Sequence, residues 1–260
     1  MTNVRSPAVA GLFYPSDPRE LRAMVAGFLG AVSAGTAPKA IIVPHAGYIY
    51  SGPVAASAYA RVKSAQGRIA RVVLLGPAHR VGFHGLALPG AVYFMTPLGR
   101  VPVDQEAIAK ISSLPQVRVM DAAHAQEHSL EVHLPFLQEV LGEFSLVPLV
   151  VGDAEAEEVG EVLDLLWGGA ETLIVISSDL SHYHDYQTAQ KLDRATSQAI
   201  EQLRPDDIDY DHACGRNPVN GLLHVARRRG LKVTTIDLRN SGDTAGSRDR
   251  VVGYGAYLFE

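Results

Sequence analysis

Short apolar runs rich in β-branched residues recur along the chain, and no other feature restricts its fold as strongly. Runs that are apolar at nearly every position suit strands covered on both faces of a sheet. A sheet with two covered faces requires helices on each side. The five clearest runs are AIIV (40–43), RVVLLG (71–76), SLVPLVVG (145–152), TLIVISSD (172–179) and KVTTIDL (232–238).

Segments with helical periodicity lie between these runs. Strands that alternate with helices favour an α/β fold, here a three-layer αβα sandwich with a central mixed, largely parallel sheet. LALPGAVYF (86–94) and VVGYGAYLFE (251–260) are interpreted as additional strands, antiparallel ones at an edge or end of the sheet. The expected helices cover 53–64, 104–113, 129–141, 155–167, 185–203 and 219–229.

Length and charge restrict the class of protein. With 260 residues and 47% hydrophobic content, the chain can bury one large core, and we expect a single domain over residues 1–260. Its 23 Lys and Arg against 28 Asp and Glu give no basic field for phosphate backbones, so we expect no nucleic-acid partner. No leader pattern or long apolar stretch is seen, so we expect a cytoplasmic protein without a membrane partner.

Histidines follow three of the predicted strands. His45 comes just after AIIV, His79 just after RVVLLG, and Asp179 and His182 just after TLIVIS. In open α/β sheets, ligands gather at the carboxyl ends of strands, where loops converge. A single histidine there is usually a structural residue, but three convergent imidazoles indicate a metal site. No short metal-binding motif such as HExxH or paired CxxC is present, so the signal lies in the topology.

Cys214 is the only cysteine, so an intrachain disulfide is excluded. In one interpretation it is a small packed apolar residue. In the other it is reactive, because the neighbouring Arg216 and the start of a predicted helix would both lower the thiol pKa. A thiolate beside two imidazoles would form a site attractive to Fe(II), Cu or Zn.

The densest ionisable stretch is HAQEHSLEVHLPFL, residues 124–137. We interpret Glu127 and His128 as residues that line the site or support its ligands at the start of the helix expected over 129–141. A purely structural capping role is the alternative for both.

Six motifs follow one another along the chain: RSPAVAGLFYP, PHAGYIYSG, GPAHR, EHSLEVHLPFLQ, SSDLSHY and CGRNPVNGLL. Together and in this order they closely resemble those of the Memo family, whose microbial members are called AmmeMemoRadiSam system protein B. The resemblance extends from about residue 5 to the end of the chain. It implies a fold similar to that of class III extradiol dioxygenases of the LigB type, which are non-haem Fe(II) enzymes.

The resemblance implies roles for five residues. His45 of PHAGY and His79 of GPAHR match metal-ligand positions, and Cys214 occupies the position of the dioxygenase carboxylate ligand. His182 matches the general acid/base histidine, with Asp179 beside it as a second catalytic candidate that orients the substrate or binds the metal. A thiolate is softer than a carboxylate and can itself be oxidised, so ring-cleaving activity is not inherited from the fold.

Two further residues are expected to line the pocket. Phe13 stands where animal relatives carry a tryptophan, which alters the shape of the wall, and Tyr50 is expected on the same cavity.

The preferred hypothesis is a metal-dependent oxidoreductase that acts on a small molecule of unknown identity. Fe(II) is the expected ion, ahead of copper, with zinc third. The alternative is a non-enzymatic metal-binding or scaffold component that acts with AMMECR-type and radical SAM partner proteins, as the family name implies. A zinc hydrolase is ranked last, because the resemblance supplies no carboxylate base for a metal-bound water.

Overall fold

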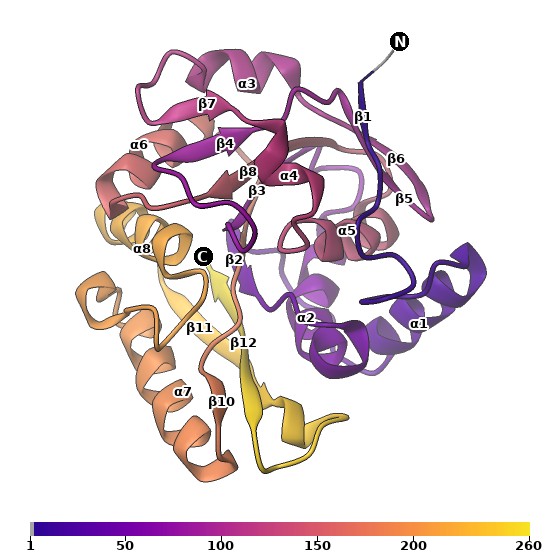
Figure 1. Ribbon diagram of the computed structural model, residues 1–260, viewed down its shortest axis with the longest axis vertical. Helices are drawn as coiled ribbons and strands as arrows, with labels where there is room; N and C mark the ends of the chain where they lie inside the picture. Colours follow the sequence, from indigo (N-terminus) through magenta and orange to yellow (C-terminus); the bar gives the residue numbers. More distant parts are fainter. Residues whose placement is uncertain (1–2) are drawn as a thin grey trace.

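A nine-stranded mixed sheet runs through the middle of the protein (Figure 1). The computed structural model describes residues 3–260. Four neighbouring strands, β2, β9, β3 and β8, are parallel, and the strands outside them are mostly antiparallel to their neighbours. The order across the sheet is β10 (His182–His184), β12 (Val251–Phe259), β2 (Ala40–Val43), β9 (Thr172–Ser177), β3 (Arg71–Pro77), β8 (Ser145–Val151), β4 (Leu86–Leu88) and β7 (Val117–Val119), with β11 (Val233–Asn240) paired to β12.

Helices cover both faces of this sheet, as the continuous apolar strands require. In β2, Ile41 and Val43 pack into one core while Ala40 and Ile42 pack into the other, because successive side chains of a strand point to opposite faces. The first face is covered by α1 (Pro18–Gly30), α2 (Tyr48–Val62), α5 (Leu134–Leu141) and a small sheet of β1 (Val4–Arg5), β5 (Tyr93–Thr96) and β6 (Gly99–Pro102). The second is covered by α3 (Gln105–Ile111), α6 (Ala156–Leu166), α7 (Tyr186–Glu201) and α8 (Arg216–Arg229).

The predicted fold class, a three-layer α/β sandwich with a mixed sheet, is confirmed, but two strands differ from expectation. The C-terminal strand β12 lies inside the sheet, because it pairs with β11 along one side and with β2 and β10 along the other. The segment 86–94 is divided between β4 in the main sheet and the start of β5 in the small sheet. Pro89 and Gly90 separate the two strands, as breakers of the ladder do.

The helices differ from expectation near their N-termini. The sequence reading missed α1, although Asp17 caps its first turn and Leu21 and Val25 form a buried i,i+4 pair. Helix α2 begins at Tyr48 instead of residue 53, because Pro53 is accommodated inside the helix instead of starting it. No helix within residues 3–260 combines the length and the apolar character that a membrane crossing requires.

Candidate metal centre

The carboxyl ends of three adjacent parallel strands carry the candidate residues. Strand β9 lies between β2 and β3, so the three chains leave the sheet at the same edge. His45, Asp179 and His79 each follow two residues after the end of β2, β9 and β3. The expected convergence at one edge of the sheet is therefore what the topology produces.

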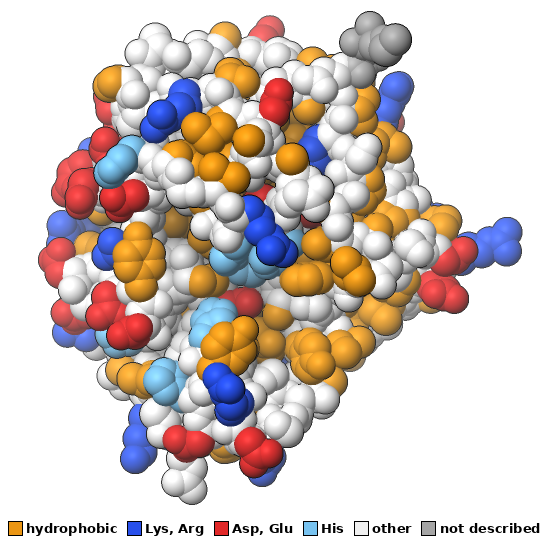
Figure 2. Space-filling model, viewed as in Figure 1, with side chains coloured by type: hydrophobic (Ala, Val, Ile, Leu, Met, Phe, Trp, Pro, Cys, Tyr) orange, Lys and Arg blue, Asp and Glu red, His pale blue; other side chains and the backbone are white. Residues whose placement is uncertain are grey.

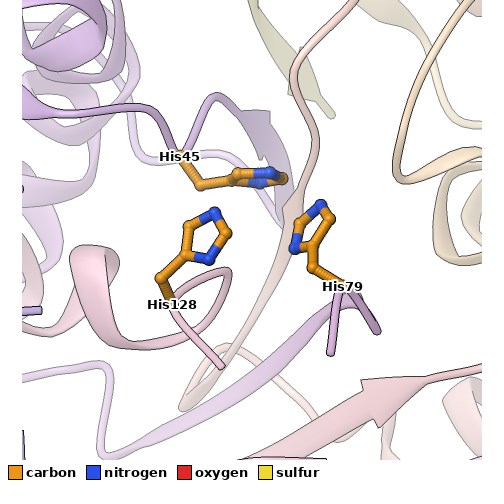
Figure 3. Close-up of side chains that lie close together, drawn as sticks. All are labelled: His45, His79 and His128. Atoms are coloured by element: carbon orange, nitrogen blue, oxygen red, sulfur yellow. The ribbon is translucent and has the colours of Figure 1, made fainter. Parts of the chain in front are cut away.

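Three imidazole rings meet at this edge (Figure 3). One ring nitrogen each of His45, His79 and His128 lies within 4.8 Å of the other two. The centroids of the His79 and His128 rings are 4.7 Å apart with nearly parallel planes, and the His45 ring stands edge-on to both. Neutral imidazoles at this separation are a donor set for a transition-metal ion.

A hydrogen-bond chain fixes the tautomer of His45. The Ser177 hydroxyl donates to the carbonyl oxygen of Ser129 at 2.6 Å, so its oxygen accepts the proton on His45 Nδ1, also at 2.6 Å. The lone pair of His45 Nε2 is thereby directed away from the sheet. Burial, followed by the neighbouring histidines, lowers the pKa of His45 well below its ordinary value, so the ring is neutral at pH 7.

Glu127 orients His79 in the same way. Its carboxylate accepts the His79 Nδ1 proton at 2.9 Å and the His79 backbone N–H at 2.6 Å, which leaves Nε2 of the ring free. Burial pushes the pKa of Glu127 upward, but the hydrogen bonds from the His79 ring, the His79 backbone N–H and the Ser129 backbone N–H outweigh it and lower the pKa to about 2. The carboxylate is therefore an anion that orients the His79 ring, an arrangement that carboxylate–histidine pairs also have at metal sites.

His128 completes the cluster from a segment without regular structure. The chain leaves α4 (Asp121–Ala125) and forms a turn over 126–130 before the short helix η2 (Glu131–His133). Its ring stacks on His79 and contacts Phe13 at a centroid distance of 4.7 Å. Burial lowers the pKa of His128 to about 4, and among residues 3–260 its buried Nδ1 has no hydrogen-bond partner.

Cys214 lies next to His45, with its Sγ 3.4 Å from Nε2 of the ring and 3.7 Å from the carbonyl oxygen of Asp179. Gly215 permits this position, because a Cβ there would lie 2.5 Å from the carbonyl oxygen of Ser177. The expected lowering of the thiol pKa is wrong. Burial, followed by the charge of Asp179, raises the pKa of Cys214, and the Arg216 guanidinium packs on the ring of Tyr210 at 3.9 Å.

Asp179 and His182 stand beside the cluster. Asp179 Oδ1 accepts the backbone N–H of His45 at 2.8 Å, and its Oδ2 lies 4.0 Å from His45 Nε2. Burial raises the pKa of Asp179 to about 7 despite these hydrogen bonds. His182 comes from β10, and burial lowers its pKa. Asp179 can therefore exchange a proton near neutral pH, and the lowered pKa of His182 favours its neutral form, which can accept one.

The cluster opens into a cavity of about 730 Å³. Figure 2 shows histidine side chains in the hollow at the middle of this face. Phe13 lies in the wall as expected from the sequence, whereas Tyr50 and Glu127 are not part of the wall formed by the described residues, and Glu127 instead lies behind His79. Besides the cluster, Asp179, His182 and Cys214, the wall includes Phe13, Arg80, Tyr183, Tyr210 and Val252.

The central place of His128 is the main feature that sequence reasoning missed. The expected helix over 129–141 put this residue at a helix start, where it would line the site or support ligands. A signal was present in Pro135, because proline is favoured in the first turn of a helix and is destabilising in its interior. The α-helix indeed begins at Leu134, and the loop before it is free to turn His128 toward His79.

Comparison with known proteins shows the family of this chain. Residues 5–258 match the family model described as Memo-like protein. The chain belongs to this family. Relatives called MEMO1 family protein come from Aquifex aeolicus, 39% identical over 98% of this chain and 99% of the relative, and from Thermotoga neapolitana, 38% identical over 96% and 98%. The predicted Memo resemblance is thus confirmed.

A solved structure shares the fold of this Memo-like chain. An uncharacterized protein from Escherichia coli aligns with a TM-score of 0.50 at 15% identity, covering 83% of this chain and 98% of its own. At that identity the likeness concerns the fold and not the chemistry of the site.

Proposed function

We propose that this Memo-like protein binds a redox-active metal ion, Fe(II) or copper, between β2 and β3, and acts as an oxidoreductase on a small molecule held in the cavity. The observation that carries the proposal is the set of three imidazoles whose nitrogens lie within 4.8 Å of one another at the floor of the cavity. Cys214 Sγ, 3.4 Å from His45 Nε2, offers a sulfur donor in addition.

The residues at this edge fit a transition-metal ion. Imidazole nitrogen and thiolate sulfur are donors that iron, copper and zinc accept. His45 and His79 each give the Nδ1 proton to a fixed acceptor, Ser177 and Glu127, so that Nε2 is the free donor atom. His128 adds a third imidazole, with one ring nitrogen within 4.8 Å of the donor nitrogens of His45 and His79.

The protein's own groups would supply the proton transfers. A bound ion supplies electron transfer and polarises an oxygen-bearing ligand. His182, whose pKa is lowered by burial, is suited to accept a proton from a molecule in the cavity. Asp179, with a pKa of about 7, is suited to hold or return one beside His45. Arg80 in the wall would bind an anionic group of the substrate.

Anaerobic reconstitution with Fe(II) or Cu(I), followed by elemental analysis, tests the metal centre. We expect about one ion per chain, and we expect His45→Ala and His79→Ala to lose most of it. His84→Ala is the matched control, because its ring is solvent-exposed and outside the cavity wall. Oxygen uptake with a panel of small molecules that falls in His182→Ala supports the enzyme. Full metal retention in both ligand variants would refute the proposal.

A non-enzymatic role is the second candidate, favoured by exposed apolar residues near the cavity. Leu12 is 80% and Ile49 56% exposed, and the hydrogen bond from Tyr48 N–H to the Phe13 carbonyl holds their segments together. Such a patch suits a partner protein, for which AMMECR-type and radical SAM proteins are the candidates. Pull-down of either that is lost in Leu12→Asp and unchanged by His182→Ala would favour this role.

A further inference from the structure

The metal centre has more donors than a single three-ligand site requires, and this surplus carries an inference that rests on the proposed function. We propose that the His45–His79 pair binds an ion with either of two third ligands, the imidazole of His128 or the thiolate of Cys214, and that the class of metal selects between them. Soft ions such as Cu(I) take the thiolate. Divalent ions such as Fe(II) and Co(II) take the third imidazole.

The distance to Cys214 already matches a shared ion. With a metal–sulfur bond of about 2.3 Å and a metal–nitrogen bond of about 2.0–2.1 Å, two ligands at a tetrahedral angle lie about 3.5 Å apart. Cys214 Sγ lies 3.4 Å from His45 Nε2. The sulfur can therefore join His45 on one ion without rearrangement of the backbone.

The donor nitrogens of the three-imidazole set, which includes His128, lie farther apart than nitrogens bound to one ion. Two imidazole nitrogens on one tetrahedral ion lie about 3.4 Å apart, whereas the nitrogens of the cluster reach up to 4.8 Å. Small rotations of the rings close this gap. The His128 and His79 rings are already stacked, with centroids 4.7 Å apart, and the His45 ring stands edge-on to both.

Cys214 has room to move toward an ion or away from it. It lies in the wall of the main cavity and also in the wall of a smaller one of about 240 Å³, which Phe83, Asn217 and Pro218 help to form. A side chain with free space on two sides can change rotamer without displacing packed atoms. The thiol can thus leave the centre when the ion prefers nitrogen.

The chemistry of the two donors determines which class of metal ion binds which third ligand. Thiolate is a soft ligand that favours Cu(I), and imidazole suits divalent iron, cobalt and nickel. The thiolate set also carries one negative charge more than the imidazole set. The Cys214 Sγ lies 3.7 Å from the carbonyl oxygen of the buried Asp179, where an extra negative charge is costly, so the thiolate is disfavoured unless the metal–sulfur bond is strong.

Anaerobic competition titrations of the full chain with Cu(I) and with Co(II) test the proposal. We expect His128→Gln to weaken Co(II) more than about 100-fold, beyond the 10–100-fold typical of a lost outer partner, and Cu(I) less than about tenfold. Cys214→Ser should do the reverse. The wild-type Co(II) complex should lack the near-ultraviolet sulfur-to-cobalt charge-transfer band. His128→Asn and Cys214→Ala repeat the test, circular dichroism checks folding, and His84→Gln is the control.

Three outcomes would overturn the two-ligand proposal while leaving the metal centre in place. Loss of both metals only in Cys214→Ser would make the thiolate the sole third ligand. Loss of both only in His128→Gln would make it the imidazole. Loss of both metals in each variant would indicate a four-ligand site. Retention of both metals in His45→Ala would instead refute the proposed function itself.

Discussion

Glu127 and Glu131 are four residues apart, and both are buried, at 2% and 0% exposure. Their carboxylates nevertheless have different roles. Glu131 is paired with the Arg5 guanidinium and also accepts hydrogen bonds from the backbone N–H groups of Ala8 and Val9 and from the Tyr14 hydroxyl. Among residues 3–260, no arginine or lysine is paired with the Glu127 carboxylate, which holds the ring of His79 instead.

Glu131 belongs to a structural hydrogen-bond network, whereas Glu127 belongs to the hydrogen-bond network of the candidate metal centre. Four donors from the N-terminal segment end on the Glu131 carboxylate, so the network fastens this segment to the short helix η2 before α5. Around Glu127 the last member is His79, whose Nε2 faces the cavity. The two networks touch at one point, where Arg5 Nη2 donates to the backbone carbonyl of Glu127 at 2.6 Å. The structural network around Glu131 therefore fixes the backbone of Glu127, whose side chain orients His79.

Glu131→Gln is expected to have the largest effect. The substitution leaves Arg5 buried without its counter-ion and places an amide NH₂ among donors, so we expect the free energy of unfolding to fall by about 3–5 kcal/mol. Urea denaturation measures it as a lower midpoint.

The matched control is Glu139→Gln, which makes the same change in a surface pair with Arg22 at 2.8 Å. This pair should contribute less than about 1 kcal/mol. Equal losses in the two variants would contradict the structural role assigned to Glu131.

Acid is expected to destabilise the region around Arg5 and Glu131, because it protonates His124. Its backbone carbonyl accepts Arg5 Nε, its buried ring donates from Nε2 to the Ala87 carbonyl, and burial lowers its pKa to about 4. The unfolded chain binds this proton near pH 6.5, so stability is complete above that pH and falls as pH drops toward 4. We expect a loss of up to about 3 kcal/mol from this residue.

Unfolding measured between pH 7 and pH 4 checks this expectation. His124→Gln should show a flatter dependence on pH than the wild type. The exposed His84→Gln should follow the wild type. Parallel curves for His124→Gln and the wild type would remove His124 as the cause.

Particular residues show what the sequence can and cannot predict here. The nearly continuous apolar residues of β2, β3 and β9 are a local property of the sequence. They predicted the three-layer fold and the sheet edge where His45, Asp179 and His79 meet. The third histidine of the cluster depends on contacts that are distant in the sequence. His128 joins the cluster through a turn that is held in place by the pairing of Arg5 with Glu131, 126 residues apart. Likewise, the thiol pKa of Cys214 depends on how deeply it is buried, which its neighbours in sequence do not reveal.

Glu127→Gln should affect the metal centre more than the fold. The amide can still accept from His79 on one side, but the anion that supports the ring is lost. We therefore expect metal affinity to fall about 10–100-fold, as for other outer partners of ligating histidines. Metal titration of the folded variant measures this loss, and the control is Glu131→Gln at a temperature where it remains folded. If Glu127→Gln binds metal normally but unfolds as easily as Glu131→Gln, the contrast between the two carboxylates fails.

Ser177→Ala is expected to have the smallest effect, because it removes the acceptor of a neutral hydrogen bond and no charge. The Nδ1 proton of His45 then loses its fixed partner, and the ring can populate the tautomer whose Nε2 is protonated and unable to bind metal. We expect about a tenfold loss of metal affinity, at the low end for an outer partner. Ser177→Thr keeps the hydroxyl and should recover most of the affinity, whereas equal loss in both variants would assign the effect to packing beneath the ring and not to the tautomer of His45.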